Sequence, residues 1–253
     1  MALEQLVIDG TGDSQPLLRQ LGKAFEAANP GTKIIVPESI GSSGGVKSLI
    51  NGKCDMARIA RPLKKKELDA GKDLIYHQFA YSPVVFTANH PEQCIDNLTT
   101  DQVVQIFSGA INDWSALGNC RPHKIYVAMR ETGDSSRSVI EKNLPGFKEI
   151  AEFTGKTVYS TPETVMTLEE HPYTISFLPQ GSITSKLLVF NFNGVAPTEA
   201  AVKQGDYPLF SPFGLVWRGE LSNLGSQFLK YLSSPAAIKI IRELGVIPVT
   251  DQR

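Results

Sequence analysis

The first forty-eight residues of the chain end with the stretch Ser39-Ile40-Gly41-Ser42-Ser43-Gly44-Gly45-Val46-Lys47-Ser48. A strand-like apolar run at residues 33–36 precedes it, and residues 46–50 have the pattern of a helix. Glycines and serines at the start of a helix present backbone N–H groups, hydroxyl donors and the positive end of the helix dipole. Such a start is typical of an anion site, and we expect residues 41–45 to form a loop there.

Two further segments have the same order of strand, small polar residues and helix. They are Gly10-Thr11-Gly12-Asp13-Ser14-Gln15 and Arg130-Glu131-Thr132-Gly133-Asp134-Ser135-Ser136-Arg137. One such segment alone is usually a helix cap or a turn. Three in one chain, one of them with an arginine, favour a site that holds an oxyanion. Ligands of open α/β sheets bind beyond the carboxyl ends of the strands, so we expect the three segments to face one cleft.

The bulk composition is that of an ordinary globular protein of 253 residues, with 42% hydrophobic and 20% charged residues. The 25 Lys and Arg nearly balance the 26 Asp and Glu, so no basic excess points to nucleic acid or to a membrane surface. No run has the length of a transmembrane helix. Residues 1–8 do not have the pattern of a signal peptide, which leaves either a cytoplasmic protein or one whose signal peptide lies outside this sequence.

Strand-like and helix-like segments alternate along the chain, which predicts the α/β class. Residues 79–87 and 207–217 are long extended segments that contain prolines and aromatic residues. We interpret them as two crossover strands between two lobes. Lobe one then comprises residues 1–82 and 213–253, and lobe two comprises residues 83–212. The alternative is one continuous α/β domain with long edge strands.

The three cysteines allow two interpretations. Cys94 and Cys120 enclose 25 residues and would form a disulfide in an oxidising compartment. Alternatively, they and Cys54 are three unrelated thiols. No Cys or His spacing predicts a metal site.

Two enzyme classes fit residues 41–48 less well than an oxyanion-binding site does. Gly41-Ser42-Ser43-Gly44-Gly45 matches the G-x-S-x-G pattern of α/β hydrolases, with Ser43 as the nucleophile, but no histidine stands in a notable context. A phosphate-binding P-loop requires glycine where this chain has Val46.

The segment Ile40–Lys47 resembles the signature of phosphate-specific binding proteins of ABC transporters, which have the type II periplasmic binding protein fold. The likeness covers most of the chain. Further matching motifs are residues 10–14, 55–63, 98–109, 112–115 and 130–137.

The resemblance implies which residues bind the ligand. Arg130 would be the cationic partner, and the remaining candidates are Asp13, Ser14, Gln15, Ser42, Ser43, Arg61, Asp134, Ser135 and Ser136. The chain departs from the family pattern at Ala60-Arg61, Asp13 and Asp134. A carboxylate can accept the proton that phosphate keeps and sulfate lacks. Asp13 or Asp134 could therefore take over the acceptor role missing at Ala60, or both are simple helix caps.

We therefore expect a monomeric binding protein, not an enzyme, that needs no cofactor and captures inorganic phosphate or a related oxyanion. The resemblance implies an ABC permease as partner and a periplasmic or extracellular location. The alternatives are a binding protein for another oxyanion or small organic anion, a sensor module, and the Ser43 hydrolase. We expect Arg58 to lie on the surface, and Trp114 to be a packing residue.

Overall fold

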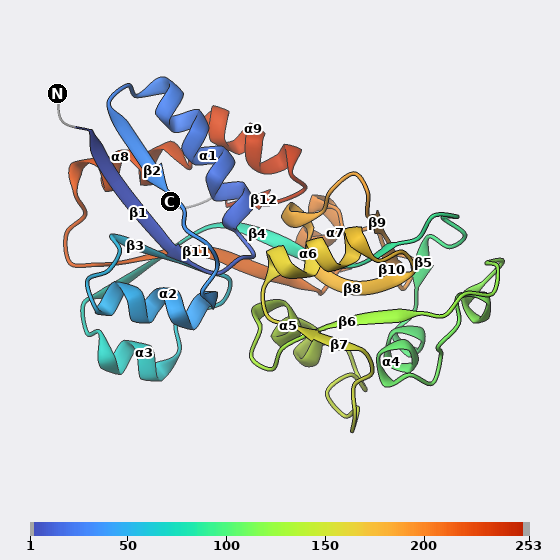
Figure 1. Cartoon of the computed structure of the whole chain (residues 1–253). Helices are drawn as coiled ribbons and strands as arrows, with labels where there is room; N and C mark the ends of the chain where they lie inside the picture. The colour runs from blue at the N-terminus through green and yellow to red at the C-terminus, as the bar shows by residue number, and fades with distance from the viewer. Residues whose placement is uncertain (1–2, 250–253) are drawn as a thin grey trace. The chain divides into compact units, whose positions relative to one another are not determined.

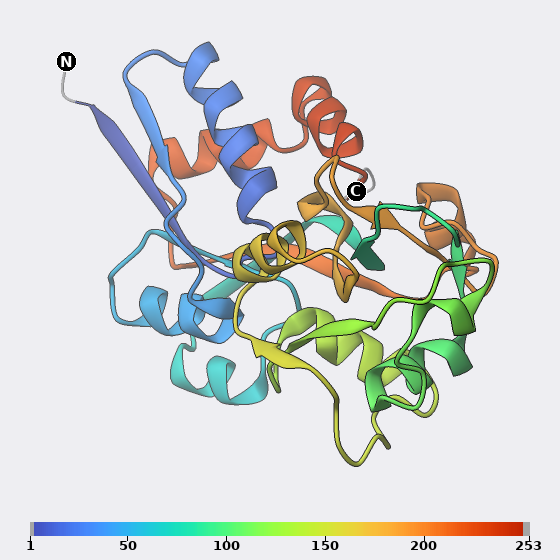
Figure 2. The same cartoon turned by 45° about the vertical axis from the view of Figure 1, so that its right-hand side comes forward.

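A computed structural model describes residues 3–249 (Figures 1 and 2). These residues form two compact units. One contains the chain up to Ser82 together with the chain from Ser211, and the other is Pro83–Phe210. The strands β4 (Leu74–Asn89) and β11 (Phe210–Arg218) contain the two points where the chain passes between the units. Strands and helices alternate as predicted, which confirms the α/β class.

The first unit is built on a mixed parallel and antiparallel sheet. Its other strands are β1 (Glu4–Gly10), β2 (Thr32–Ile35), β3 (Met56–Ile59) and β12 (Ile247–Pro248). Strand β1 lies between β2 and β3 and is parallel to both, whereas β11 is antiparallel to β3. Strand β12 pairs in the antiparallel sense with the first half of β4. The carboxyl ends of β1, β2 and β3 therefore meet at one edge of the sheet.

Helices cover both faces of this sheet (Figure 1). They are α1 (Gln15–Ala28), α2 (Gly41–Ile50), α3 (Lys65–Ala70), α8 (Asn223–Tyr231) and α9 (Pro235–Glu243). Leu17, Leu21 and Phe25 form the predicted apolar stripe of α1, and they join one core cluster with residues of α8 and α9. Val46 and Leu49 of α2 pack on the opposite face. Burial of these stripes is what holds the helices to the sheet.

The main strands of the second unit are built onto the second half of β4. Besides β4, its strands are β5 (Asn97–Leu98), β6 (Tyr126–Arg130), β7 (Lys156–Val158), β8 (Thr174–Pro179), β9 (Leu188–Val189) and β10 (Asn191–Phe192). Strand β6 lies between β7 and β8 and is parallel to both, while β8 and β9 are antiparallel to the second half of β4. Strands β5 and β10 form a separate small parallel sheet.

Helical segments of the second unit enclose an aromatic core. They are α4 (Thr100–Ser108), η1 (Trp114–Leu117), α5 (Ser135–Asn143), α6 (Thr161–Glu170), η2 (Gln180–Ser182) and α7 (Glu199–Gln204). Phe107 of α4 contacts Phe86, Phe147 and Phe177, with ring centroids 5.4–6.2 Å apart. Each fully buried phenylalanine contributes about 1.5–3 kcal/mol through burial of apolar surface. This unit thus has a core of its own.

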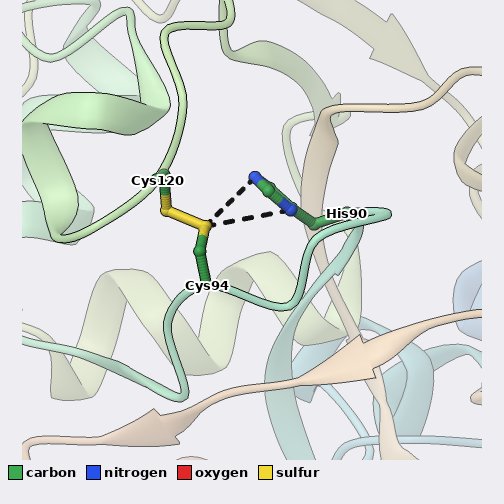
Figure 3. Close-up of side chains that lie close together, drawn as sticks. All are labelled: His90, Cys94 and Cys120. Carbon is green, nitrogen blue, oxygen red and sulfur yellow. Dashed lines mark hydrogen bonds between the residues drawn. A yellow bond between two sulfur atoms is a disulfide. The ribbon is translucent and has the colours of Figure 1, made fainter.

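A disulfide joins Cys94 to Cys120, with their Cα atoms 5.1 Å apart, so the first of the two interpretations of the cysteines holds. Figure 3 shows His90 beside it, with Nε2 3.5 Å from Cys94 Sγ. The Glu92 amide donates to His90 Nδ1 at 3.2 Å. Because Nδ1 accepts this bond, a neutral His90 carries its proton on Nε2 and directs it at the sulfur. Trp114 is fully buried, as expected of a packing residue.

Two local predictions were wrong in detail. Residues 41–45 are not a loop, because helix α2 already begins at Gly41. The apolar run of residues 187–192 predicts one strand, but it contains the two short strands β9 and β10, which pair with different partners. Serine and glycine have low helix propensity, but α2 forms from its first residue where it packs on the sheet, and tertiary packing overrides that preference.

Candidate anion-binding residues

In the first unit, the start of α2 is in close contact with the end of β1. The Ile40 amide donates to the Gly10 carbonyl at 3.0 Å. A Cβ on Gly45 would lie 2.6 Å from Gly10 Cα, so only glycine fits there. These contacts fix the first turn of α2 next to the strand end from which residues 11–15 continue. Two of the three predicted anion-binding segments are therefore neighbours within this unit.

The residues before and at the start of α1 are polar and buried. Asp13, Ser14 and Gln15 are each at most 1% exposed. Ser14 is the N-cap residue of α1, but its side chain caps no amide. Its Oγ has no hydrogen-bond partner within residues 3–249, nor has Oε1 of Gln15, whose Nε2 donates to Glu38 at 3.0 Å. An unpaired buried hydroxyl costs about 1–3 kcal/mol, so Ser14 is a strong candidate to bind a ligand.

Arg58 does not lie on the surface, which corrects the prediction. Its side chain is completely buried and donates to the carbonyls of Ile8, Thr11 (2.7 Å) and Pro37 (2.8 Å). Burial lowers the pKa of Arg58 to about 10, and the guanidinium is still charged at neutral pH. By binding three carbonyls at once, it holds the turn after β1 against the segment after β2. It thereby supports the turn that leads to Ser14, and each of its three side-chain nitrogens already donates to a carbonyl.

The predicted ligand residues of α2 and β3 are already hydrogen-bonded in part. Ser42 Oγ accepts a bond from the Ala60 amide at 3.2 Å. Arg61 forms a bidentate pair with Glu67, at 2.7 and 2.9 Å, and donates to Ser43 Oγ at 2.9 Å. Burial raises the pKa of Glu67, but the bonds from Arg61 and the Lys64 amide outweigh it and lower that pKa overall. Arg61 is thus anchored beside the start of α2.

Ser43 lacks the neighbour that a hydrolase nucleophile needs. It is exposed, and its Oγ is in contact with Arg61 and, at 3.5 Å, with Lys64 Nζ. Two cationic groups cannot accept the hydroxyl proton, and a serine nucleophile depends on a base that does. Among residues 3–249, no histidine is hydrogen-bonded to Ser43.

In the second unit, Arg130 stands at the end of β6 and is 3% exposed. Its Nη1 donates to Thr164 Oγ1 at 2.6 Å, and its Nη2 donates to the Asp134 carboxylate. Thr164 also donates to the Ser160 carbonyl at 2.8 Å, which fixes its hydroxyl as an acceptor for Arg130. The guanidinium is therefore held rigidly by α6 and by the start of α5.

The start of α5 combines a cap with a small buried hydroxyl. Asp134 is the N-cap residue and accepts from the Arg137 amide at 3.0 Å, so the interpretation of Asp134 as a cap holds. Ser135 and Ser136 follow it and are buried. Ser136 Oγ has no hydrogen-bond partner in the part of the chain that the structure describes. Ser136 thus resembles Ser14 of the first unit: a buried hydroxyl at a helix start, where the dipole favours anions.

One group of residues has the composition of a metal site. His90, Cys94 and Cys120 place ligand atoms within 4.8 Å of one another (Figure 3). The two sulfur atoms are bonded to each other, and a disulfide sulfur is not the thiolate that binds a metal. In this disulfide form the group is a covalent link with a histidine donor beside it.

Comparison with known proteins identifies the family of this chain. The PBP superfamily domain matches residues 2–236, so the chain belongs to this superfamily. Two curated relatives are each named phosphate-binding protein PstS. The one from Bacillus subtilis is 28% identical over 98% of this chain and 82% of the relative. The one from Borreliella burgdorferi is 26% identical, over 96% and 89%.

Solved structures share the fold. A substrate-binding protein from Clostridium perfringens, solved with bound phosphate, superposes with a TM-score of 0.84 at 23% identity, covering 97% of this chain and all of the other. An ABC-type phosphate transport receptor from Vibrio cholerae superposes with a TM-score of 0.67 at 22% identity, covering 96% and 99%. The predicted type II periplasmic binding protein fold and the family resemblance are thereby confirmed.

Sequence reasoning missed Thr164 and misplaced Arg58. Thr164 lies on α6, 34 residues after Arg130, and a threonine within a helix carries no signal of its role. Arg58 follows three residues of the motif 55–63, and only the fold shows that its side chain turns inward. Among the described helices, none combines the length and apolar character needed to cross a bilayer.

Proposed function

We propose that this protein captures inorganic phosphate, or a closely related oxyanion, and delivers it to the permease of an ABC importer. The observation that carries the proposal is the pair of buried hydroxyls, Ser14 and Ser136, which have no partner among the described residues. Each stands at the start of a helix. An oxyanion offers acceptors to a buried hydroxyl at a helix start and to the adjacent helix amides, and each of the two hydroxyls, within its own unit, is suited to such a ligand.

Arg130 supplies the positive charge in this proposal. It is buried and oriented by Thr164 and Asp134, so binding an anion costs little further ordering of the side chain. The names of the relatives support phosphate as the anion. Binding is achieved by replacing the water of the ion with fixed donors, and no bond is made or broken.

Selection of phosphate over sulfate requires an acceptor for the phosphate proton. We assign this role to Asp13 and not to Asp134. Both oxygens of Asp134 already accept bonds, from the Arg137 amide and from Arg130. Asp13 is 1% exposed and lies next to Ser14. Ser42, Ser135 and Gln15 complete the proposed set, with Ser43 and Arg61 supporting the start of α2.

The site of action proposed is the periplasm or the cell exterior, and the Cys94–Cys120 disulfide supports an oxidising compartment. We propose that residues 79–87 and 207–217 act as hinges, because β4 and β11 are where the chain passes between the units. The proposed form is a monomer.

Calorimetric titration tests the proposal. We expect one phosphate per chain, weaker binding of sulfate, and an affinity for phosphate about a hundredfold lower in Arg130→Ala, since a buried charge-assisted bond contributes about 3 kcal/mol. A small-angle scattering measurement should show a smaller radius of gyration with phosphate. The absence of phosphate binding, together with tight binding of an organic anion, would overturn the assignment of the ligand.

A further inference from the structure

A cavity lies entirely within the second unit, at the end of β6 opposite to Arg130. It has a volume of about 550 Å³ and is formed by the beginning of β6 and the end of α6, next to β7. In Figure 1, β6 and β7 lie side by side in the yellow-green part of the chain. The volume is in the range of small-molecule sites. Its apolar wall includes Ile125, Val127 and Pro172.

Two lysines, Lys124 and Lys156, give the lining positive charge, and no carboxylate belongs to it among the described lining residues. Neither lysine forms an ion pair within residues 3–249; Lys124 Nζ lies 5.4 Å from the ring centre of Tyr126. Tyr126 is 52% exposed, which is high for a large aromatic side chain. An aromatic surface and two available ammonium groups thus border the same cavity.

Thr174, at the first position of β8, provides an independent observation. It lines the cavity and is 3% exposed, and its Oγ1 has no hydrogen-bond partner in the described part of the chain. A buried hydroxyl without a hydrogen-bond partner is unfavourable unless a ligand supplies that partner. The nearby Ser176 of the same strand, by contrast, donates to the Ala128 carbonyl at 2.6 Å.

We propose that this cavity is a second binding site, specific for a small organic anion with a compact apolar body, such as an aromatic carboxylate. The apolar wall would bind the body, the lysines the carboxylate, and Thr174 one oxygen. Inorganic phosphate does not fit this chemistry, because the ion has no apolar surface to set against Ile125, Val127 and Pro172. The site is therefore distinct from the proposed phosphate residues.

Ligand-observed NMR with 2-naphthoate tests the proposal, with the neutral 2-naphthamide as the matched probe. All titrations contain saturating phosphate, so that any anion site around Arg130 is filled. We expect naphthoate to bind about tenfold more tightly than the amide. The double variant Lys124→Ala/Lys156→Ala should lose at least about fivefold in naphthoate affinity, and Thr174→Val a similar factor.

Lys148→Ala, at an exposed lysine outside the lining, is the matched control and should bind naphthoate as the parent protein does. Phosphate titration of each variant reports that the protein is folded and that its phosphate affinity is unchanged. Absence of naphthoate binding, equal binding of the amide, or full affinity in the double lysine variant would each overturn the proposal.

Discussion

Asp134 accepts a hydrogen bond from the guanidinium of Arg130, four residues earlier, and the same carboxylate caps helix α5 through the Arg137 amide. The buried guanidinium of Arg130 therefore has an anionic neighbour before any ligand is bound. A second bond, to Thr164 at 2.6 Å, involves a different helix. A buried cation held by two elements keeps its direction, and the residues that hold it are as important as the cation itself.

Thr164→Val tests whether this positioning matters. The change keeps the shape of the side chain but leaves a buried N–H of Arg130 without its acceptor. We expect the phosphate affinity to fall about tenfold, measured by calorimetry. Thr167→Val, three residues further along α6, is the matched control and should leave phosphate affinity unchanged. Equal affinity in both variants would contradict a positioning role for Thr164.

Ser14→Ala and Ser136→Ala should separate binding from stability. Because neither hydroxyl has a partner among the described residues, its removal relieves the cost of an unpaired buried hydroxyl and should raise the unfolding free energy in the absence of phosphate, by up to about 1 kcal/mol. Phosphate affinity should fall about tenfold in each, because a charge-assisted hydrogen bond is lost. Urea unfolding and calorimetry give the two quantities.

Ser176→Ala provides the contrast. Its hydroxyl is buried and bonded to Ala128, so we expect a loss of about 1 kcal/mol of stability and no change in phosphate affinity. A large loss of stability in the Ser14 or Ser136 variants, with binding intact, would show that these hydroxyls are structural.

Asp13→Asn and Asp134→Asn should differ in selectivity. If Asp13 accepts the phosphate proton, the variant Asp13→Asn should bind phosphate about tenfold more weakly. Its affinity for sulfate relative to phosphate should rise. Asp134→Asn disturbs Arg130, so it should weaken both anions by similar factors. The measured quantity is the ratio of the phosphate and sulfate dissociation constants at pH 7. A change of that ratio in the Asp134 variant alone would transfer the role to Asp134.

Loss of the disulfide should destabilise the protein. The bond joins residues separated by 26 positions, and a closed loop of that size stabilises by about 3 kcal/mol in the chain-entropy account. We expect Cys94→Ser/Cys120→Ser to lower the unfolding free energy by about that amount, measured by urea unfolding. Added reductant should destabilise the parent protein and Cys54→Ser alike, and should leave the double variant unchanged.

Gly45→Ala tests the packing of α2 on β1. The added Cβ would lie 2.6 Å from Gly10 Cα, a backbone atom that cannot move aside by a change of rotamer. We expect a loss of about 2 kcal/mol of stability and weaker phosphate binding, as the start of α2 is displaced. In Gly44→Ala the nearest atom is Ile40 Cβ at 3.1 Å, in a half-exposed side chain. This neighbouring variant should be affected much less.

Much of the fold could be predicted from the sequence, because its signals are local. The apolar spacing of residues 16–28 specified α1, and Thr99 with Gly109 marked the ends of α4. The segments of residues 10–15 and 130–137 identified the helix starts of α1 and α5, whereas α2 begins at Gly41, within the segment expected to be a loop. These features depend on contacts within one or two turns, which neighbouring residues specify by themselves.

The tertiary structure alone decided which polar groups are satisfied. Arg58 is internal because three carbonyls from two separate segments converge on it, and Thr164 matters because α6 places it beside Arg130. All four serines Ser14, Ser42, Ser136 and Ser176 are buried. Only the surrounding residues determine that Ser42 and Ser176 are hydrogen-bonded, whereas Ser14 Oγ and Ser136 Oγ have no partner among the described residues. The chain alone thus specified residue types and helix starts, whereas hydrogen bonds between distant segments determined which of those residues remain available to bind an ion.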